Sequence, residues 1–318
     1  MKMLKRLAKH LKYYIAACSA GLRFKNLYLA LGIFLCVGMV MNAVSPIFAA
    51  DYTNSVAPDP VHAGQKEGNK GSAEHYPGQS RKLTAIIVDD FGNGMKGTKE
   101  MLDLPAHITV AVMPFLPTTK QDAEEAHRKG HDVLVHLPME PNKGKKEWLG
   151  PGAIMSGMTD EEVRTRVEAA IDEVPHAVGI NNHMGSKITA DRRIMSVILD
   201  VCKERGMFFV DSRTNHKSVV DELASEKGLP PVHNDIFLDD VYTLTHVSRQ
   251  MNAVSNWLNS HDTCVMIGHV GMPGLYTSSV LRQSIPELQK KTELVGIRRL
   301  VSTVWGWTPE PTMPLSAP

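Results

Sequence analysis

Short apolar runs alternate with longer amphipathic stretches between residues 83 and 307 of the chain. Most of these runs are almost continuously apolar, which is typical of strands that are buried on both faces of a parallel sheet. Strands are therefore predicted at residues 83–90, 108–114, 132–138, 177–183, 207–212 and 263–270.

The stretches between the predicted strands carry helix start and stop signals. Residues 159–174 begin with Thr-Asp-Glu-Glu, which places a capping residue before acids in the first turn, and residues 118–130 end at a glycine. Further helices are predicted at 190–205, 247–260 and 278–291. The repeated order of strand and helix predicts an α/β fold. We expect a distorted (β/α) barrel of about seven mostly parallel strands that forms one catalytic domain, residues 83–307.

The N-terminal part of the chain has a different pattern. Residues 1–26 are basic, residues 27–50 carry no charge and are largely apolar, and the first acidic residue is Asp51. The apolar run is long enough to cross a bilayer, and its basic flank is predicted to stay in the cytoplasm. Two alternatives stay open, a cleaved signal peptide and an uncleaved membrane anchor. Both predict an exported domain that is secreted or held at the membrane.

Composition adds a few limits. Residues 51–82 are rich in Gly, Pro, Ser and charge and are predicted to be a disordered linker, and the proline-rich residues 308–318 a flexible tail. The net charge of +1 gives no reason to expect a nucleic-acid partner. Beyond the N-terminal part, the cysteines are Cys202 and Cys264, for which two isolated buried thiols are favoured over a disulfide.

Polar side chains follow the apolar part of several predicted strands. Asp89 and Asp90 end the first strand, His136 lies in the third, His183 ends the fourth, and His269 lies at the end of the last. Active sites of α/β barrels lie at the carboxyl ends of the strands. One such residue is explained by a structural cap, but the repetition at several strand ends predicts a functional site.

The pair of adjacent carboxylates indicates a cation. Two neighbouring anions raise each other's pKa unless a cation or hydrogen bonds compensate. Asp90, His136 and His183 are predicted to hold a divalent metal ion, with zinc as the first choice. A metal with an open position activates water, a nearby carboxylate can act as base, and a histidine opposite can act as acid. The pattern therefore predicts a metal-dependent hydrolase.

At these residues the chain resembles polysaccharide deacetylases of the carbohydrate esterase type, and more closely the divergent polysaccharide deacetylase family. Residues 87–92, Ile-Val-Asp-Asp-Phe-Gly, resemble the usual first motif, T-F-D-D-G. This resemblance implies that Asp89 is the general base and Asp90 a metal ligand. Residues 130–140 align with the second motif, G-H-E-I-x-x-H-[ST]-x-x-H, so that His136 matches the first metal histidine and Glu140 replaces the second.

The remaining motifs match less completely. The third motif, R-x-P-Y-G, is absent, and Asn-Asn-His-Met-Gly-Ser stands in its place at 181–186, where His183 would supply the missing imidazole. Asp211 is matched to the aspartate of the fourth motif, and Arg213 is expected to replace the missing arginine that orients the base. Ile-Gly-His, ending at His269, resembles the fifth motif, L-x-H, and implies that His269 is the general acid.

The expected substrate is a carbohydrate of the cell envelope that loses N- or O-acetyl groups. Asn182, Glu140 and Trp148 are expected to contact it, with Trp148 stacking on a sugar ring. Two other roles stay open: Trp148 is instead a loop residue that shields the site from solvent, and Glu140 instead orients a ligand histidine. Two alternatives stay open because the motifs are incomplete and no sugar-specific signal is present. One is a weakly active or inactive carbohydrate-binding or scaffold protein of the same fold, and the other is a metal hydrolase that cleaves a non-sugar amide.

Overall fold

The computed structural model describes residues 81–309, which lie in the compact unit His75–Pro318. The predicted segments 1–26 and 27–50, the linker up to residue 80 and the tail after residue 309 lie outside the described residues. The strands are β1 Leu83–Phe91, β2 Thr109–Val112, β3 Asp132–Met139, β4 Ala177–Met184, β5 Phe208–Asp211, β6 Val232–His233, β7 Ile236–Phe237, β8 Thr263–His269 and β9 Glu293–Leu294.

Helices connect the strands. They are α3 Thr98–Leu102, α4 Thr119–Arg128, α5 Asp160–Glu173, α6 Arg192–Glu204, α7 Val220–Glu226, α8 Leu244–Trp257, α9 Gly274–Leu288 and α10 Ile297–Trp305, with short 3₁₀ turns at Lys146–Trp148 and Ile188–Ala190. The caps explain some of these boundaries, since Thr159 and Glu162 form a capping box at the start of α5. No helix within residues 81–309 combines the length and the apolarity that a membrane crossing needs.

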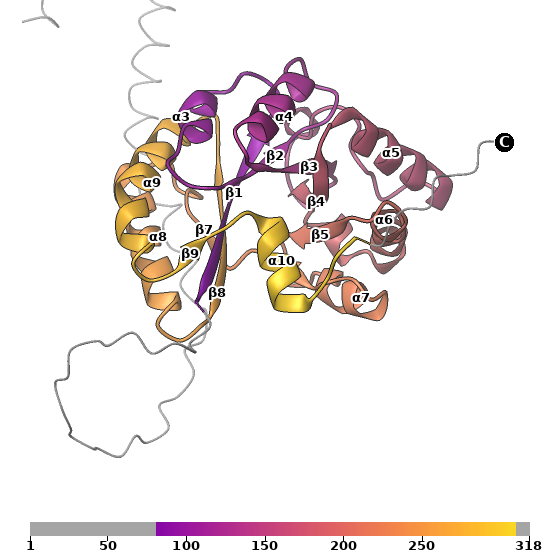
Figure 1. Cartoon of the computed structure of the whole chain (residues 1–318). Helices are drawn as coiled ribbons and strands as arrows, with labels where there is room; N and C mark the ends of the chain where they lie inside the picture. Colours follow the sequence, from indigo (N-terminus) through magenta and orange to yellow (C-terminus); the bar gives the residue numbers. More distant parts are fainter. Residues whose placement is uncertain (1–80, 310–318) are drawn as a thin grey trace, which may run out of the picture. The chain divides into compact units, whose positions relative to one another are not determined.

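All the described strands form one parallel sheet, in the order β6-β5-β4-β3-β2-β1-β8-β7, with β9 beside the start of β1 (Figure 1). The two edge strands are separated by two residues. Of these, Asn234 N donates to Asp211 O and Asp235 N donates to Val265 O, so the chain crosses from β5 to β8 and brings the edges together. The sheet is a curled half-barrel, which confirms the predicted α/β class and the single barrel-like domain.

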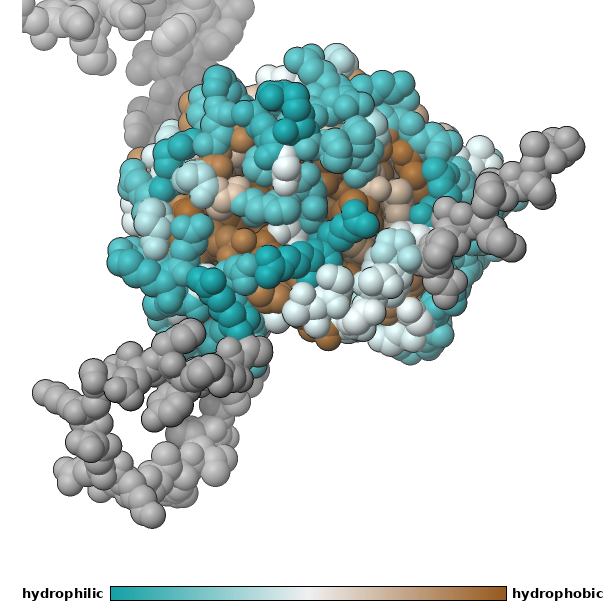
Figure 2. Space-filling model, in the orientation of Figure 1, coloured by the Kyte–Doolittle hydropathy of each residue, from teal (hydrophilic) through white to brown (hydrophobic). Residues whose placement is uncertain are grey.

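Two hydrophobic layers follow from the curl. The larger one lies between the sheet and the helices around it, and contains Cys202 and Cys264, both free and buried as predicted. The smaller one fills the inside of the barrel with inward-facing strand residues, and α10 adds Ile297, Leu300 and Val301 to it. In the face drawn in Figure 2, hydrophilic residues cover most of the surface and hydrophobic residues lie in hollows between them.

Candidate metal and catalytic site

Alternate side chains along a strand point to the same face of the sheet, and this alternation decides which predicted residues reach the rim of the barrel. In β1, Leu83, Ala85 and Ile87 belong to the inner hydrophobic cluster, and Asp89 continues this inward-facing row at the strand end. By the same spacing, Leu134 precedes His136 in β3 and Ile267 precedes His269 in β8. Asp89 and His269 are also register partners across β1 and β8.

A bulge in β1 brings Asp90 to the same side as Asp89. In a regular strand two successive side chains point to opposite faces. The register between β1 and β2 shifts between Val88 and Phe91, and Asp90 has φ 72°, in the left-handed region. Such a conformation is uncommon for a residue other than glycine, and strained backbone of this kind clusters at functional sites.

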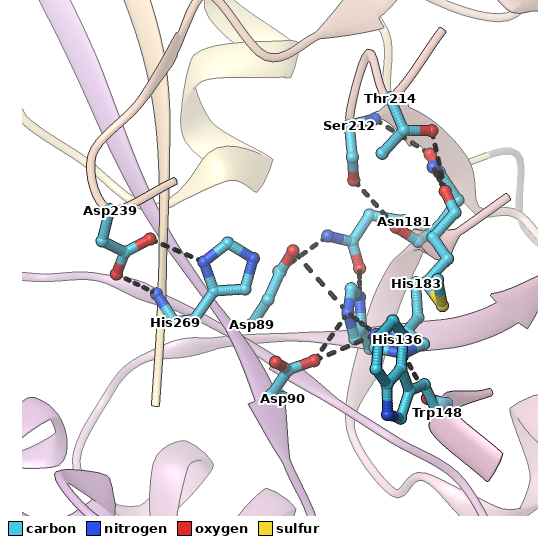
Figure 3. Close-up of polar contacts among 12 residues, drawn as sticks. Asp89, Asp90, His136, Trp148, Asn181, His183, Ser212, Thr214, Asp239 and His269 are labelled. Carbon is cyan, nitrogen blue, oxygen red and sulfur yellow. Dashed lines mark hydrogen bonds and ion pairs between the residues drawn. The ribbon is translucent and has the colours of Figure 1, made fainter. Parts of the chain in front are cut away.

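Asp90, His136 and His183 form the cluster that the sequence predicts for a metal, and their ligand atoms all lie within 4.8 Å of one another (Figure 3). Asp90 Oδ1 is 3.3 Å from His136 Nε2 and 3.0 Å from His183 Nδ1, and the two ring nitrogens are 3.1 Å apart. Ligand atoms of a tetrahedral zinc site with bonds of 2.0–2.1 Å are about 3.3 Å apart. The spacing therefore suits one small metal ion.

The hydrogen bonds around the cluster fix where the protons lie. Asn181 Nδ2 donates to Asp89 Oδ1 over 2.8 Å, so its Oδ1 faces His136 and accepts from Nδ1 over 2.8 Å. His183 Nε2 must donate to the Trp148 carbonyl, 3.0 Å away, because a carbonyl oxygen only accepts. In the neutral rings, His136 Nε2 and His183 Nδ1 are then both lone pairs.

Three electron-rich atoms thus converge with no proton between them. Asp90 Oδ1 is buried and has no hydrogen-bond partner within the described part of the chain. An unpartnered buried carboxylate oxygen is costly, and a cation bound between it and the two ring nitrogens would remove that cost. The donor set of one carboxylate and two imidazoles fits a divalent metal of the zinc type.

The two neighbouring aspartates have opposite electrostatic environments. Burial raises the pKa of Asp89 above its ordinary value, although the nearby His136 and His269 oppose this. Burial acts in the same direction on Asp90. When His136 and His183 are protonated in place of a bound cation, their hydrogen bonds outweigh burial and hold the pKa of Asp90 well below the ordinary range. A pair of carboxylates whose pKa values are driven apart in this way is typical of a division between a base and an ionised ligand.

His269 lies on the other side of Asp89 from the metal cluster (Figure 3). Its Nδ1 donates to Asp239 Oδ1 over 2.7 Å, and the other oxygen of Asp239 accepts from His269 N at 2.8 Å and from Thr277 Oγ1 at 2.7 Å. Burial would lower the pKa of His269, but the hydrogen bond to Asp239 and the charges of Asp90, Asp239 and Asp89 outweigh burial and raise it to about 9. The ring is therefore held as an imidazolium.

This arrangement can be compared with known proteins. A family model for the divergent polysaccharide deacetylases matches residues 86–301, more than half of the chain. The chain belongs to this family. The resemblance predicted from the motifs is therefore confirmed.

Two bacterial proteins are similar in sequence to this family member. An uncharacterized protein of Haemophilus influenzae is 36% identical over 216 residues, which are 68% of this chain and 75% of that protein. The uncharacterized protein YibQ of Escherichia coli is 32% identical over 218 residues, 69% of this chain and 67% of that protein. The solved structure of the uncharacterized protein ATU2773 from Agrobacterium tumefaciens has a TM-score of 0.65 at 19% identity, covering 71% of this chain and 92% of that one, which shows the shared fold.

Two of the predicted catalytic residues, Asp211 and Arg213, are not directed at Asp89. Asp211 lies two residues after Phe209 in β5 and so points to the same face, that of the outer hydrophobic layer. Its Oδ1 accepts from the backbone N of Arg213 over 2.8 Å. The Arg213 guanidinium pairs with Asp221 at 3.0 Å. Asn181, and not Arg213, donates a hydrogen bond to Asp89, the residue predicted to be the base.

The three residues expected to contact substrate have mixed surroundings. Glu140 accepts from Ser156 N and pairs with Lys187, each at 2.7 Å, and it is not in the metal cluster. Asn182 is buried, and its side chain is engaged within the protein, since its Oδ1 accepts from Ser212 N and its Nδ2 donates to Met184 O.

Trp148 differs from these two residues. The Trp148 backbone carbonyl accepts a hydrogen bond from His183 Nε2, while the residue as a whole is 60% exposed. Of the three, Trp148 is the most exposed, and Lys145 Nζ lies over its ring, 5.6 Å from the centroid.

Two residues of the site were not among those predicted from the sequence, Asn181 and Asp239. Asn181 is adjacent to the predicted Asn182, but the two side chains point to opposite faces of the sheet. Asn181 pairs in register with His136, and Asn182 pairs with the outward-facing Leu137. Asp239 follows β7, a two-residue strand that is too short to give a periodic signal. A short acidic pair, Asp239 and Asp240, was the only sign of it in the sequence.

Proposed function

We propose that this protein is a metal-dependent deacetylase that removes acetyl groups, attached through nitrogen or oxygen, from a carbohydrate of the cell envelope. The observation that carries the proposal is the convergence of three lone pairs, from Asp90, His136 and His183, directly beside a buried carboxylate and an imidazolium. Membership of the divergent polysaccharide deacetylase family supports the reaction type. Export to the cell envelope rests on residues 1–50 and stays a prediction.

Asp90, His136 and His183 would hold the metal, for which zinc is the first choice. When bound there, a divalent metal lowers the pKa of a water ligand and polarises a carbonyl oxygen. The chain itself supplies the preorganised surroundings. Asn181 fixes the ring of His136, and the Trp148 carbonyl fixes the ring of His183, so both nitrogens face the same point.

Asp89 takes a proton from the attacking water. One of its oxygens is held by Asn181, while Oδ2 faces the cluster, 3.7 Å from His136 Nε2. Burial raises the pKa of Asp89, which makes the carboxylate a better base than an exposed aspartate.

His269 gives a proton to the departing amine or alcohol. Its Nδ1 is engaged by Asp239, which leaves the proton at Nε2 for the leaving group. The buried charge of Asp239 keeps the ring protonated at neutral pH. The base and the acid are thus neighbours on the adjacent strands β1 and β8, beside the metal cluster, where one can take a proton and the other can give one.

The proposal is tested by acetate release from N-acetylated oligosaccharides with the full-length, zinc-loaded protein. We expect release by the native chain and a loss of about 10³-fold in kcat for Asp89→Asn, since a general base contributes 10² to 10⁴. The Asn side chain keeps the size and the hydrogen bond to Asn181 but cannot take a proton. Equal rates for the native and Asp89→Asn proteins would remove Asp89 from the mechanism, and absence of release by both would favour a scaffold or a non-sugar substrate.

A further inference from the structure

Exposed apolar side chains gather beside the proposed acid. Within residues 81–309, eleven large hydrophobic residues are exposed, and seven of them belong to position 95 and the segments 241–244 and 272–276. These seven are Met95, Val241, Tyr242, Leu244, Met272, Leu275 and Tyr276. Large apolar side chains left together in water are uncommon on a monomer and mark a binding surface.

The three segments share a cavity with the reacting groups. It has a volume of about 270 Å³ and is lined on its polar side by Asp90, Asp239, Asp240 and His269. Its apolar side is formed by Met95, Tyr242, Val270, Met272 and Pro273. One cavity therefore joins the proposed acid to three exposed apolar side chains, Met95, Tyr242 and Met272.

The apolar edge of this cavity is fixed by backbone contacts. Gly271 N donates to Lys96 O over 2.8 Å, which ties the loop after β8 to the loop after β1. Gly97 and Gly274 pack so closely that a Cβ on Gly97 would lie 2.7 Å from the Gly274 carbonyl carbon. Met272 is nevertheless 79% exposed, so a rigid loop holds an apolar side chain in solvent.

The opposite edge of the site is polar. After β3, the Glu140–Lys187 ion pair and the amide of Asn142, which donates to Ser186 O, accompany the exposed ring of Trp148. An aromatic ring among such hydrogen-bonding groups suits a sugar. The metal cluster lies between this polar edge and the apolar edge, because His183 contacts Trp148 O while Asp90 lines the apolar cavity.

We infer that the substrate is amphiphilic, an N-acetylated sugar that carries an alkyl or acyl chain, and that the chain lies over Met95, Tyr242 and Met272. This inference rests on the proposed function, since it names the class of substrate for the same site. Methionine suits the role, because its flexible thioether adapts to chains of varied shape.

The inference is tested by comparing methyl and octyl N-acetylglucosaminide as substrates of the full-length zinc-loaded protein, below the micelle-forming concentration of the octyl glycoside. We expect kcat/KM to be at least roughly tenfold higher for the octyl glycoside, the ratio that burial of about two methylene groups provides. Met95→Gln and Met272→Gln, which keep side-chain size, should each reduce that ratio. Val304→Gln, at an exposed apolar position on α10, is the matched control and should leave it unchanged.

The outcomes separate this inference from the proposed function. Equal kcat/KM for both glycosides would overturn the inference and leave the deacetylase function intact. If neither glycoside releases acetate, the function fails, and binding to the Asp89→Asn protein decides the inference by calorimetry. Tighter binding of the octyl than of the methyl glycoside would support it, and equal or absent binding would overturn it.

The chain could come from a soluble amphiphile or from a membrane lipid. A lipid with an N-acetylglucosamine headgroup in phosphatidylcholine vesicles tests the second source, with plain vesicles as control. Acetate release from these vesicles would assign the apolar edge to a lipid-linked sugar. Release from the dispersed octyl glycoside alone would assign it to a soluble amphiphile.

Discussion

His136 and His269 occupy equivalent places, each in the inward-facing row near the end of its strand, yet their Nδ1 atoms have different partners. His136 Nδ1 donates to a neutral amide, Asn181, whereas His269 Nδ1 donates to a buried carboxylate, Asp239. The amide fixes the tautomer and leaves a lone pair at Nε2, which suits a metal ligand. The carboxylate stabilises the imidazolium and leaves a proton at Nε2, which suits an acid. The Nδ1 partner thus distinguishes the two rings. Burial lowers the pKa of His136, but Asp89 and Asp90 outweigh burial and raise it, so a metal ion must displace the proton from its Nε2.

Among changes that distinguish the roles of His136 and His269, His269→Gln is expected to have the largest effect on kcat. Loss of the acid should lower kcat by about 10³-fold, within the range of 10² to 10⁴ for general acid catalysis, while bound zinc stays at the native level. Acetate release and metal content measured on the same sample would check this. A parallel loss of zinc would mean that His269 belongs to the metal cluster and that the comparison is mistaken.

A smaller effect is expected from Asn181→Ala on the ligand side. His136 would lose its Nδ1 partner, and zinc affinity should fall about 10- to 100-fold, as for other outer-shell partners of a ligand histidine. Competition with a zinc-binding dye gives the affinity. Asn182→Ala is the matched control, because Asn182 bonds Ser212 N on the outward side. It should lower the free energy of unfolding by about 1–3 kcal/mol and leave zinc affinity unchanged. Similar zinc affinities for the two variants would contradict the role of Asn181.

The smallest effect is expected from Asp239→Asn, which keeps a hydrogen-bond acceptor and removes the charge. The pKa of His269 is raised to about 9 and the acid must be protonated, so native kcat/KM should fall as the pH rises through this value. The variant should move that alkaline limb to lower pH. If the pKa falls by about one unit, the loss is about twofold at pH 8 and approaches tenfold at about pH 10. A pH profile of kcat/KM with an unmoved limb would show that His269 does not control it.

The same pair contributes to stability in a defined pH window. Because the folded pKa of His269 is raised above its ordinary value of 6.5, its contribution is full below about pH 6.5 and is lost as the pH rises through about 9. The stability difference between the native and Asp239→Asn proteins should therefore shrink over this interval.

The fold was predictable because the long strands have continuous apolar runs and the helices have clear caps. The six predicted strands and five predicted helices are all present, close to their predicted bounds. β6, β7 and β9 have two residues each and α3 has five, too few to give a periodic signal. The connection from β5 to β8 runs through β6, residues 234 and 235, and β7, and was therefore not predictable.

The candidate site was predictable where residue type and strand end agree, as for Asp89, Asp90, His136, His183 and His269. Motif alignment alone was a weaker guide. It placed Glu140 on a ligand position, while the structure pairs it with Lys187. The choice between Asn181 and Asn182, and the link from Asp239 to His269, depend on register between strands that lie far apart in the sequence.

The central claim is that Asp90, His136 and His183 hold one metal ion while His269 remains free of it. The direct measurement is zinc stoichiometry of the purified full-length protein by plasma mass spectrometry, for the native chain, His183→Ala and His269→Ala. The account predicts about one zinc per chain in the native protein and in His269→Ala, and a strong loss in His183→Ala, where one of three ligands is missing. Native protein that binds no transition metal, or full occupancy in His183→Ala, would contradict it.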